Sequence, residues 1–301
     1  MSGNGQVAPP GLTDADLPAL FKAADKASLA GQHRLLWSLG AGLALNMLAA
    51  VASLFLTTSG TDLAAGGASV AFFLAILVGV FVLVDRPERA WYEGRAAAES
   101  AKTLAWLYAV GGGPFSLKRD GQADGLFAAH LQELLREIAD VSLSLDEDEQ
   151  VTSAMRELRA SDLADRRSAY ARGRLEDQRK WYAAKASQNE TLARNWRLVI
   201  LALQAAGLTG ALLKATGTMN VNLLGLLAAG AAAATAWLQA KEHATLANAY
   251  GIAAQELAVI KVRLGEPSNE DEWAVFVEEA EEAISREHKL WLARRGGRSR
   301  P

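Results

Sequence analysis

The 301-residue sequence contains no cysteine, and this absence excludes several kinds of chemistry at once. Disulfide bonds, nucleophilic catalysis by a thiol and metal sites built from thiolates are all ruled out. Signatures of other enzyme classes are missing as well: no glycine-rich phosphate loop follows a strand, and there is no Gly-x-Ser-x-Gly motif. We therefore expect neither enzymatic activity nor a bound cofactor.

Charged residues are missing from four long stretches, 35–61, 63–84, 198–213 and 215–240. Crossing the hydrocarbon core takes roughly 20 apolar residues, with about 17 as the usual lower limit, so three of the stretches are long enough. The third is slightly short, but Trp196, Arg197 and Lys214 at its ends can reach the interface by snorkelling. The sequence thus predicts an all-α membrane protein with two tandem transmembrane hairpins and long cytoplasmic helices.

The two hairpins resemble copies of one unit, as a search for fixed-period similarity shows. The matched positions, separated by 157 to 159 residues, are Trp37 and Trp196, Asn46 and Gln204, Tyr92 and Tyr250, and the turns at 59–61 and 216–218. We divide the chain into a disordered N-terminus (1–15), a first two-span unit (16–145), a second two-span unit (146–295) and a disordered tail (296–301).

The basic residues predict the orientation. Lys and Arg flank the hairpins on the side of both termini and of the middle segment, whereas the two turns carry only Lys214. Under the positive-inside rule both termini lie in the cytoplasm, and we expect a multi-pass protein of a bacterial inner membrane. The polar residues 1–34 contain no apolar core of a signal peptide, and the net charge of -3 does not suggest nucleic acid as a partner.

Outside the spans the pattern is helical. One apolar stripe comprises Phe127, Leu131, Leu134 and Ile138, and another comprises Trp273, Val277, Ala280, Ile284 and Trp291. The second stripe lies on a helix that we expect to begin with Ser268 and Asp271. A Gly-Gly-Gly-Pro sequence at 111–114 should end the helix that leaves the second span, whereas 162–197 contains no breaker and should form one rod that runs directly into the third span.

Two amides lie near the middle of the spans, Asn46 and Gln204. Intramembrane polar groups usually face a bundle interior or water, so these residues are candidates for lining a conduit. The alternative is that they hydrogen-bond between helices. Small residues should allow close packing of the spans; they are Gly40, Ala44, Gly207, Gly210, Gly225 and Gly230.

Other candidates for a functional site lie on the predicted cytoplasmic helices. Arg95 and Glu99 are four residues apart, which favours an intrahelical pair over contact with a signal or a second subunit. Aromatic residues that could stack on a nucleotide base, or could simply pack between helices, are Trp91, Tyr92, Trp181 and Tyr182. The four histidines show no metal-ligand spacing, and the acidic run 146–149 indicates the solvated start of a helix rather than a cation site.

Several of these segments resemble SLATT proteins. The stretch 89–106, which reads RAWYEGRAAAESAKTLAW and is followed by Pro114-Phe115, is similar to the segment after the hairpin in that family. Tyr170, 174–176 (RLE), 178–182 (QRKWY), Lys185-Ala186, Asn189 and 273–291 are similar to another SLATT subfamily. The resemblance covers about residues 20 to 295.

The resemblance implies a function. SLATT domains are two-span units of bacterial conflict systems, found beside nucleotide-generating SMODS enzymes or nucleotide-sensing SLOG domains, and are regarded as pore-forming effectors. This chain departs from the simplest pattern because it has two units and no nucleotide sensor. We therefore expect a homo-oligomeric pore or channel gated by cytoplasmic helices, with a nucleotide-signalling enzyme or sensor as a partner. The alternative is a non-conducting scaffold or sensor subunit that anchors a cytoplasmic partner.

Overall fold

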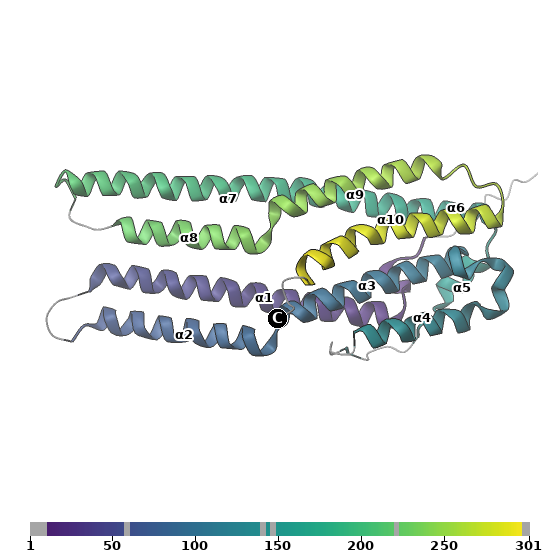
Figure 1. Ribbon diagram of the computed structural model, residues 1–301, viewed down its shortest axis with the longest axis horizontal. Coiled ribbons are helices and arrows are strands. Elements are labelled where there is room, and N and C mark those ends of the chain that lie inside the picture. The colour runs from purple at the N-terminus through teal and green to yellow at the C-terminus, as the bar shows by residue number, and fades with distance from the viewer. Residues whose placement is uncertain (1–10, 57–60, 139–142, 145–148, 220–222, 297–301) are drawn as a thin grey trace, which may run out of the picture. The chain divides into compact units, whose positions relative to one another are not determined.

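The computed structural model describes residues 11–56, 61–138, 143–144, 149–219 and 223–296, and these are helical without a strand (Figure 1). This confirms the predicted fold class. The α-helices are α1 (Ala19–Ala52), α2 (Leu63–Asp85), α3 (Pro87–Val110), α4 (Ala123–Glu137), α5 (Ser153–Ala160), α6 (Leu163–Tyr170), α7 (Asp177–Ala215), α8 (Leu223–Lys241), α9 (His243–Arg263) and α10 (Glu270–Gly296). A π-helical segment, η5 (Ala171–Glu176), joins α6 to α7, and short 3-10 turns are η1 (Asp14–Asp16), η2 (Ser53–Phe55), η3 (Gly113–Phe115) and η4 (Leu117–Gln122).

The chain folds into two compact units, each assembled from separate parts of the sequence. The membrane unit comprises Gln32–Pro87 and Ala186–Asn248, and the polar unit comprises Met1–Gly31, Glu88–Lys185 and Ala249–Pro301. Four helices have the length and composition needed to cross a membrane. The two predicted hairpins are α1 with α2 and α7 with α8, and the protein is a multi-pass membrane protein.

Within the membrane unit, α8 contacts both α7 and α1. A Cβ added at Gly230 of α8 would lie 3.7 Å from Leu203 of α7 and 3.8 Å from Met47 of α1. Gly207 and Gly210 of α7 similarly face leucines of α8, so these glycines allow the close packing that was predicted. The prediction is wrong for Gly225, which has nothing within 4 Å, and for Ala44, which is exposed.

The polar unit has an aromatic core. Its largest fully buried apolar side chains include Trp106, Tyr108, Tyr170, Phe115 and Trp273. Both predicted stripes face this core, since Phe127 and Leu131 of α4 and Val277 and Ala280 of α10 are buried. The side chain of Trp291 lies outside the described residues.

The Gly-Gly-Gly-Pro sequence ends α3 at Val110, as predicted, and buried arginines hold the resulting turn. Arg159 donates to the carbonyl oxygens of Tyr108 and Phe115 at 2.7 and 2.8 Å, and Arg166 donates to that of Val110 at 2.9 Å. Trp273 of α10 also donates to the Val110 carbonyl, at 2.8 Å. Carbonyl groups that α3 leaves unpaired at its end are thereby satisfied.

The N-terminal segment is ordered from Gly11 onward, so the predicted disorder through residue 15 is wrong. Leu12 is buried, η1 begins at Asp14, and Thr152 donates a hydrogen bond to the Asp16 carbonyl at 2.7 Å. Residues 1–10, 297–301 and most of the acidic run 146–149 lie outside the described residues.

The predicted start of α10 is displaced by one residue. The side chain of Asn269, rather than that of Ser268, accepts hydrogen bonds from the backbone N–H groups of Asp271 and Glu272. Glu272, rather than Asp271, accepts from the backbone N–H and hydroxyl of Ser268, which lies just before the cap. An acidic first turn remains, in agreement with the helix dipole.

The second helix of each hairpin ends in the same unusual way. Arg86 follows α2 with φ of 45°, and Glu242 follows α8 with φ of 50°. Both are non-glycine residues in the left-handed region, which is uncommon for such residues. In each case another helix begins at the next residue, α3 at Pro87 and α9 at His243. The sequence repeat is thus accompanied by a repeated break in the backbone.

Candidate functional site

One continuous helix, Leu163–Ala215, contributes to both units. The predicted rod at 162–197 therefore exists, but it is not α-helical throughout, because η5 interrupts it (Figure 1). At the end of η5 the N–H of Asp177 bonds to the carbonyl of Arg172, five residues earlier. Such π turns are rare inside α-helices and frequently occur at functional sites.

A buried ion pair lies on this π turn. Arg174 donates to Glu281 of α10 through Nε at 2.9 Å and through Nη2 at 2.7 Å, and both side chains are 1% exposed. The carboxylate accepts two further hydrogen bonds at 3.0 Å, from the hydroxyl groups of Tyr170 and of Thr103 on α3. The pair therefore connects three helices through one carboxylate.

The surroundings of Arg174 favour its charged form. Burial alone disfavours the charged guanidinium, but the Glu281 carboxylate more than offsets this effect, and the pKa of Arg174 is raised. Burial, together with the same carboxylate, raises the pKa of Tyr170 well above its usual value, so its hydroxyl remains a donor. Nη1 of Arg174 is buried without a hydrogen-bond partner. Breaking such a pair on one side leaves an uncompensated buried charge, at a cost of about 3–5 kcal/mol.

The backbone of the π turn is also closely packed. A Cβ at Gly173 would lie 3.0 Å from the Trp106 ring and 3.2 Å from the Cα of Gly11. The N-terminal segment therefore crosses the π turn at a position where two glycine backbones meet. Any side chain at either glycine would push the segment away from the helix.

The predicted aromatic candidates contact other aromatic rings of the polar unit. Trp91 and Tyr92 have ring centroids 4.9 Å apart, and Trp181 lies 5.3 Å from Tyr182 and 5.4 Å from Tyr250. These distances are within the range of packed aromatic pairs, so the packing interpretation is possible for all four residues, and stacking on a nucleotide base stays a prediction.

Arg95 and Glu99 form the predicted intrahelical pair on α3, with Nη2 2.8 Å from Oε1. The guanidinium of Arg95 also lies 5.8 Å from the centre of the Trp181 ring. This cation–π contact links α3 to the segment that continues into the third span. Among the described residues no group of three or more histidine or acidic side chains could hold a metal ion.

Asn46 and Gln204 are both exposed on the single chain. Neither side-chain amide forms a hydrogen bond within the part of the chain that the structure describes. The two amides therefore do not hydrogen-bond between helices of a single chain, which leaves open a hydrogen bond between copies and the lining of a conduit. Water or a second copy of the chain would have to satisfy these amides in the bilayer.

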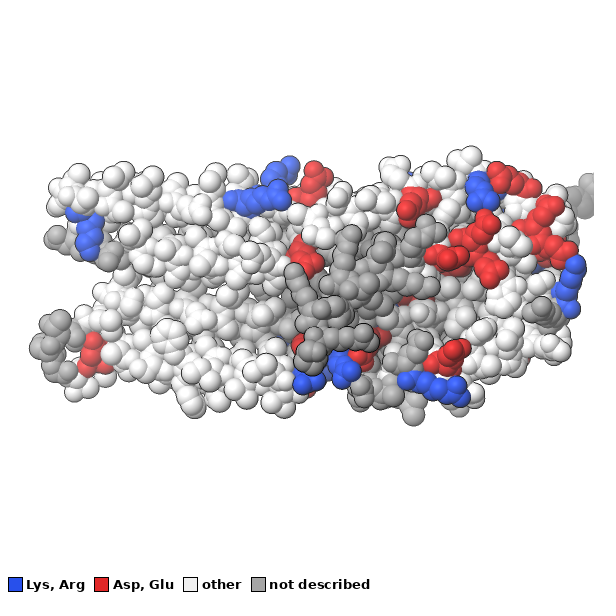
Figure 2. All heavy atoms as spheres, in the orientation of Figure 1, with Lys and Arg blue, Asp and Glu red and all other residues white. Residues whose placement is uncertain are grey.

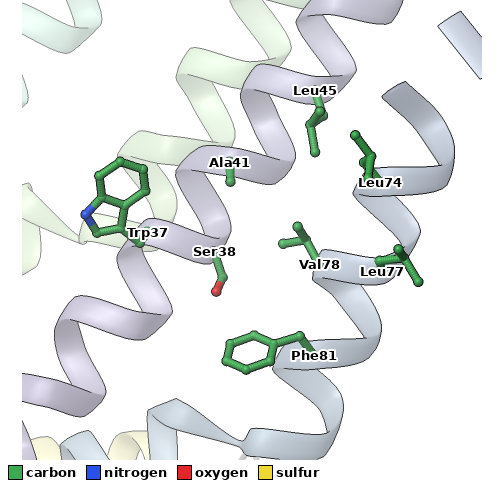
Figure 3. Close-up of a pocket in the computed structure, with 8 residues that line it drawn as sticks. All are labelled: Trp37, Ser38, Ala41, Leu45, Leu74, Leu77, Val78 and Phe81. Carbon is green, nitrogen blue, oxygen red and sulfur yellow. The ribbon is translucent and has the colours of Figure 1, made fainter. Parts of the chain in front are cut away.

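An open groove with a volume of about 510 Å³ separates parts of α1 and α2. In Figure 3, Ser38 of α1 and Val78 and Phe81 of α2 point into the space between the two helices. The hydroxyl of Ser38 is the only polar side-chain group in the lining besides the indole of Trp37. The residues that line this groove carry no charge.

Comparison with known protein families gives two matches in tandem. Residues 18–167 match SMODS and SLOG-associating 2TM effector domain 3, and residues 170–291 match SMODS and SLOG-associating 2TM effector domain 1. The matches meet close to η5, whereas the boundary expected from the sequence lies after residue 145. No curated protein and no solved structure matches the chain.

Proposed function

Because the chain belongs to the SMODS and SLOG-associating two-transmembrane effector (SLATT) family, with two units in tandem, we propose that it is a membrane effector that forms a gated pore. One observation carries the proposal: a single helix joins the buried Arg174–Glu281 pair of the polar unit to the third membrane span. A rearrangement of the polar unit would move that span directly. The action belongs to a bacterial conflict system, and both termini lie in the cytoplasm of the host.

The pore requires several copies of the chain. Packed helices lie about 8–10 Å apart, and small residues draw them closer, so four spans enclose too little space for hydrated ions. In the most apolar part of each span only 6–11% of the residues are buried within one chain, which leaves surface for lipid and for neighbouring copies. A symmetric homo-oligomer is the expected assembly.

The resting pore is closed, since a permanently open one would dissipate the membrane potential of the host. Opening starts from the π turn, where the Arg174–Glu281 pair fixes α7 against α3 and α10. Release of this pair allows η5 to change its hydrogen-bond register, which rotates or shifts α7. The trigger comes from a nucleotide-signalling enzyme or sensor associated with the protein.

Reconstitution of the purified full-length protein in liposomes tests the proposal. Ion flux should be low for the intact chain and higher for Glu281→Gln, because the neutral amide no longer holds Arg174. Thr103→Val, which removes one hydrogen bond to Glu281 and one from Arg174 but leaves the ion pair itself, serves as a milder variant should Glu281→Gln fold poorly. If no variant conducts, the pore function is wrong.

Asn46→Leu and Gln204→Leu test the two amides. If they line the conduit, either change should lower single-channel conductance while leaving the size of the oligomer unchanged. A smaller oligomer or a lower melting temperature would show instead that the amides hold subunits together.

A non-conducting scaffold is the second candidate function, and one observation favours it. On the part of α9 in the polar unit, Ile252, Val259 and Val262 are 56%, 65% and 82% exposed. These residues recur at helical spacing on the side opposite to the buried Leu257 and would suit an apolar helix of a cytoplasmic partner. Replacing Val259 and Val262 with Ser should abolish partner binding without changing flux if both activities exist.

A further inference from the structure

One exposed face of α7 carries polar residues that continue from the start of the membrane unit into the third span. Residues that recur at alternating steps of four and three along this face are Glu190, Arg194, Arg197, Leu201, Gln204 and Leu208, and all six are exposed. We call this set the α7 stripe. Its four polar members form no hydrogen bond or ion pair within the part of the chain that the structure describes.

Contacts inside the membrane unit give the depth of this stripe. The Trp196 ring of α7 lies 6.5 Å from that of Trp237 on α8, and Trp237 in turn faces Gly40 of α1. Further along, Gly230 of α8 faces both Leu203 of α7 and Met47 of α1. Each α7 residue is therefore level with the α1 residue numbered 156 lower, as 196 with 40 and 203 with 47.

This register places both arginines beyond the charged rim of the first hairpin. The rim is marked by Arg34 of α1, which pairs with Asp85 of α2 at 3.0 Å. Arg194 is level with Ser38 and Arg197 with Ala41, so at 1.5 Å per residue they lie about 6 and 10 Å further into the membrane unit than Arg34. Basic side chains (blue) lie over part of α7 in Figure 2, next to acidic ones (red).

Contact with lipid tails does not suit this face. An Arg at the centre of a span costs about 2.5–3.5 kcal/mol on insertion scales, and Arg194 and Arg197, which lie nearer the rim, can lower this cost by snorkelling. Gln204 lies on the same face seven residues beyond Arg197, about 10 Å deeper, and its side chain is too short to reach back. Water along the stripe would satisfy all of these groups together.

We propose that the α7 stripe lines the conduit and that Arg194 and Arg197, repeated in every copy, form a basic ring that makes the pore prefer anions. The inference rests on the proposed function and specifies its selectivity. Rings of Arg or Lys select anions because they replace part of the ion's hydration with a favourable charge. Glu190, one turn toward the polar unit on the same face, offsets only one of the two positive charges.

Reversal potentials in a potassium chloride gradient test the selectivity. The Glu281→Gln variant, in which the pore is expected to be open, should pass chloride in preference to potassium. Added to this variant, Arg197→Glu should lower the chloride-to-potassium permeability ratio at least severalfold, whereas Arg34→Gln, which removes a positive charge at the rim, should leave it unchanged. A cation-selective Glu281→Gln variant, or a ratio that Arg197→Glu does not change, overturns the inference alone. Complete absence of current overturns the pore function and the selectivity with it.

Thiol labelling gives a second measurement, and because the chain has no cysteine, an introduced cysteine is the only thiol that can react. In liposomes, Gln204→Cys should react with a charged methanethiosulfonate, while Ile76→Cys, at an exposed mid-span position of α2, should not. If neither variant reacts with the methanethiosulfonate, the stripe faces lipid and the inference is overturned.

Discussion

The guanidinium of Arg174 meets the carboxylate of Glu281 in two hydrogen bonds, of 2.9 and 2.7 Å, although the two residues are 107 positions apart. Because Arg174 belongs to a π turn, this pair stabilises a helical register that an uninterrupted α-helix would not have. The pair is thus a stabilising contact of the polar unit, and under the proposed function it is also the contact that gates the pore.

Removing the charge of Glu281 should destabilise the protein strongly. We expect Glu281→Gln to lower the free energy of unfolding by about 3–5 kcal/mol, since Arg174 keeps its charge without a counterion. Thermal unfolding of the purified chain measures this, with Glu279→Gln as the control because Glu279 forms an exposed pair with Arg263. Replacing both partners, as Arg174→Met with Glu281→Leu, should recover most of the loss. Equal stability of the two single Gln variants would contradict the role of the buried pair.

A close backbone contact between α1 and α3 predicts a glycine requirement. A Cβ at Gly94 would lie 2.9 Å from the backbone nitrogen of Ser28 and 3.0 Å from the Ala24 carbonyl oxygen. Gly94→Ala should therefore cost about 1–3 kcal/mol through overpacking. Gly125→Ala on α4 is the matched control, because nothing lies within 4 Å of its position, and it should slightly stabilise the helix. A Gly94→Ala protein as stable as the control would show that the helices can separate freely.

Alkaline pH should destabilise the polar unit through Tyr108. Burial, followed by the hydrogen bond to Asp124, raises the pKa of Tyr108 to about 12 from 10.0. Its contribution to stability is complete below pH 10 and is lost as the pH rises through 12, because the unfolded chain ionises first. Melting temperatures measured across this range should fall less steeply for Tyr108→Phe. Parallel curves for the two proteins would be the contrary result.

The basic residues around the hairpins predict the orientation in the membrane. Single cysteines at Gly60 and Gly217 should react with an impermeant reagent added outside intact cells, and one at Asp148 should not. Labelling of the Asp148→Cys variant from outside would reverse the topology.

Mechanical coupling through α7 can be interrupted directly. Inserting Gly-Gly after Ala184, or replacing Ala183 and Ala184 with Gly without changing the length, should soften the helix just before it enters the membrane unit. In cells that carry the native trigger, the intact chain should depolarise the membrane and both variants should not, as a potential-sensitive dye would report. The same insertion after Gly265, between α9 and α10, is the control and should leave depolarisation intact. Retained potential with the intact chain would favour the scaffold function.

The sequence predicted what depends on local patterns. Uncharged length identified the spans, and the Gly-Gly-Gly-Pro sequence gave the end of α3 at Val110, because both are properties of adjacent residues. The stripe of Phe127 and Leu131 was likewise correctly assigned to the core.

What the sequence did not predict depends on contacts between distant residues. The π turn contains no proline, and it occurs where Gly173 packs against Trp106 and Gly11 while Arg174 turns toward Glu281. The left-handed conformation of Glu242 occurs at a residue that gives no local signal, unlike a glycine, whereas Arg86 precedes Pro87, which disfavours a continued α-helix.

The matched breaks at Arg86 and Glu242 make the two helices of each hairpin mechanically unequal. The first spans belong to the unbroken helices α1 and α7, whereas each second span, α2 or α8, ends at a left-handed residue before the next helix, α3 or α9, begins. A continuous helix transmits torque along its axis, because its hydrogen bonds resist untwisting, and a joint at a single residue does not. A torque applied to α1 or α7 outside the spans would therefore reach the span itself, whereas one applied to α3 or α9 would be absorbed at Arg86 or Glu242.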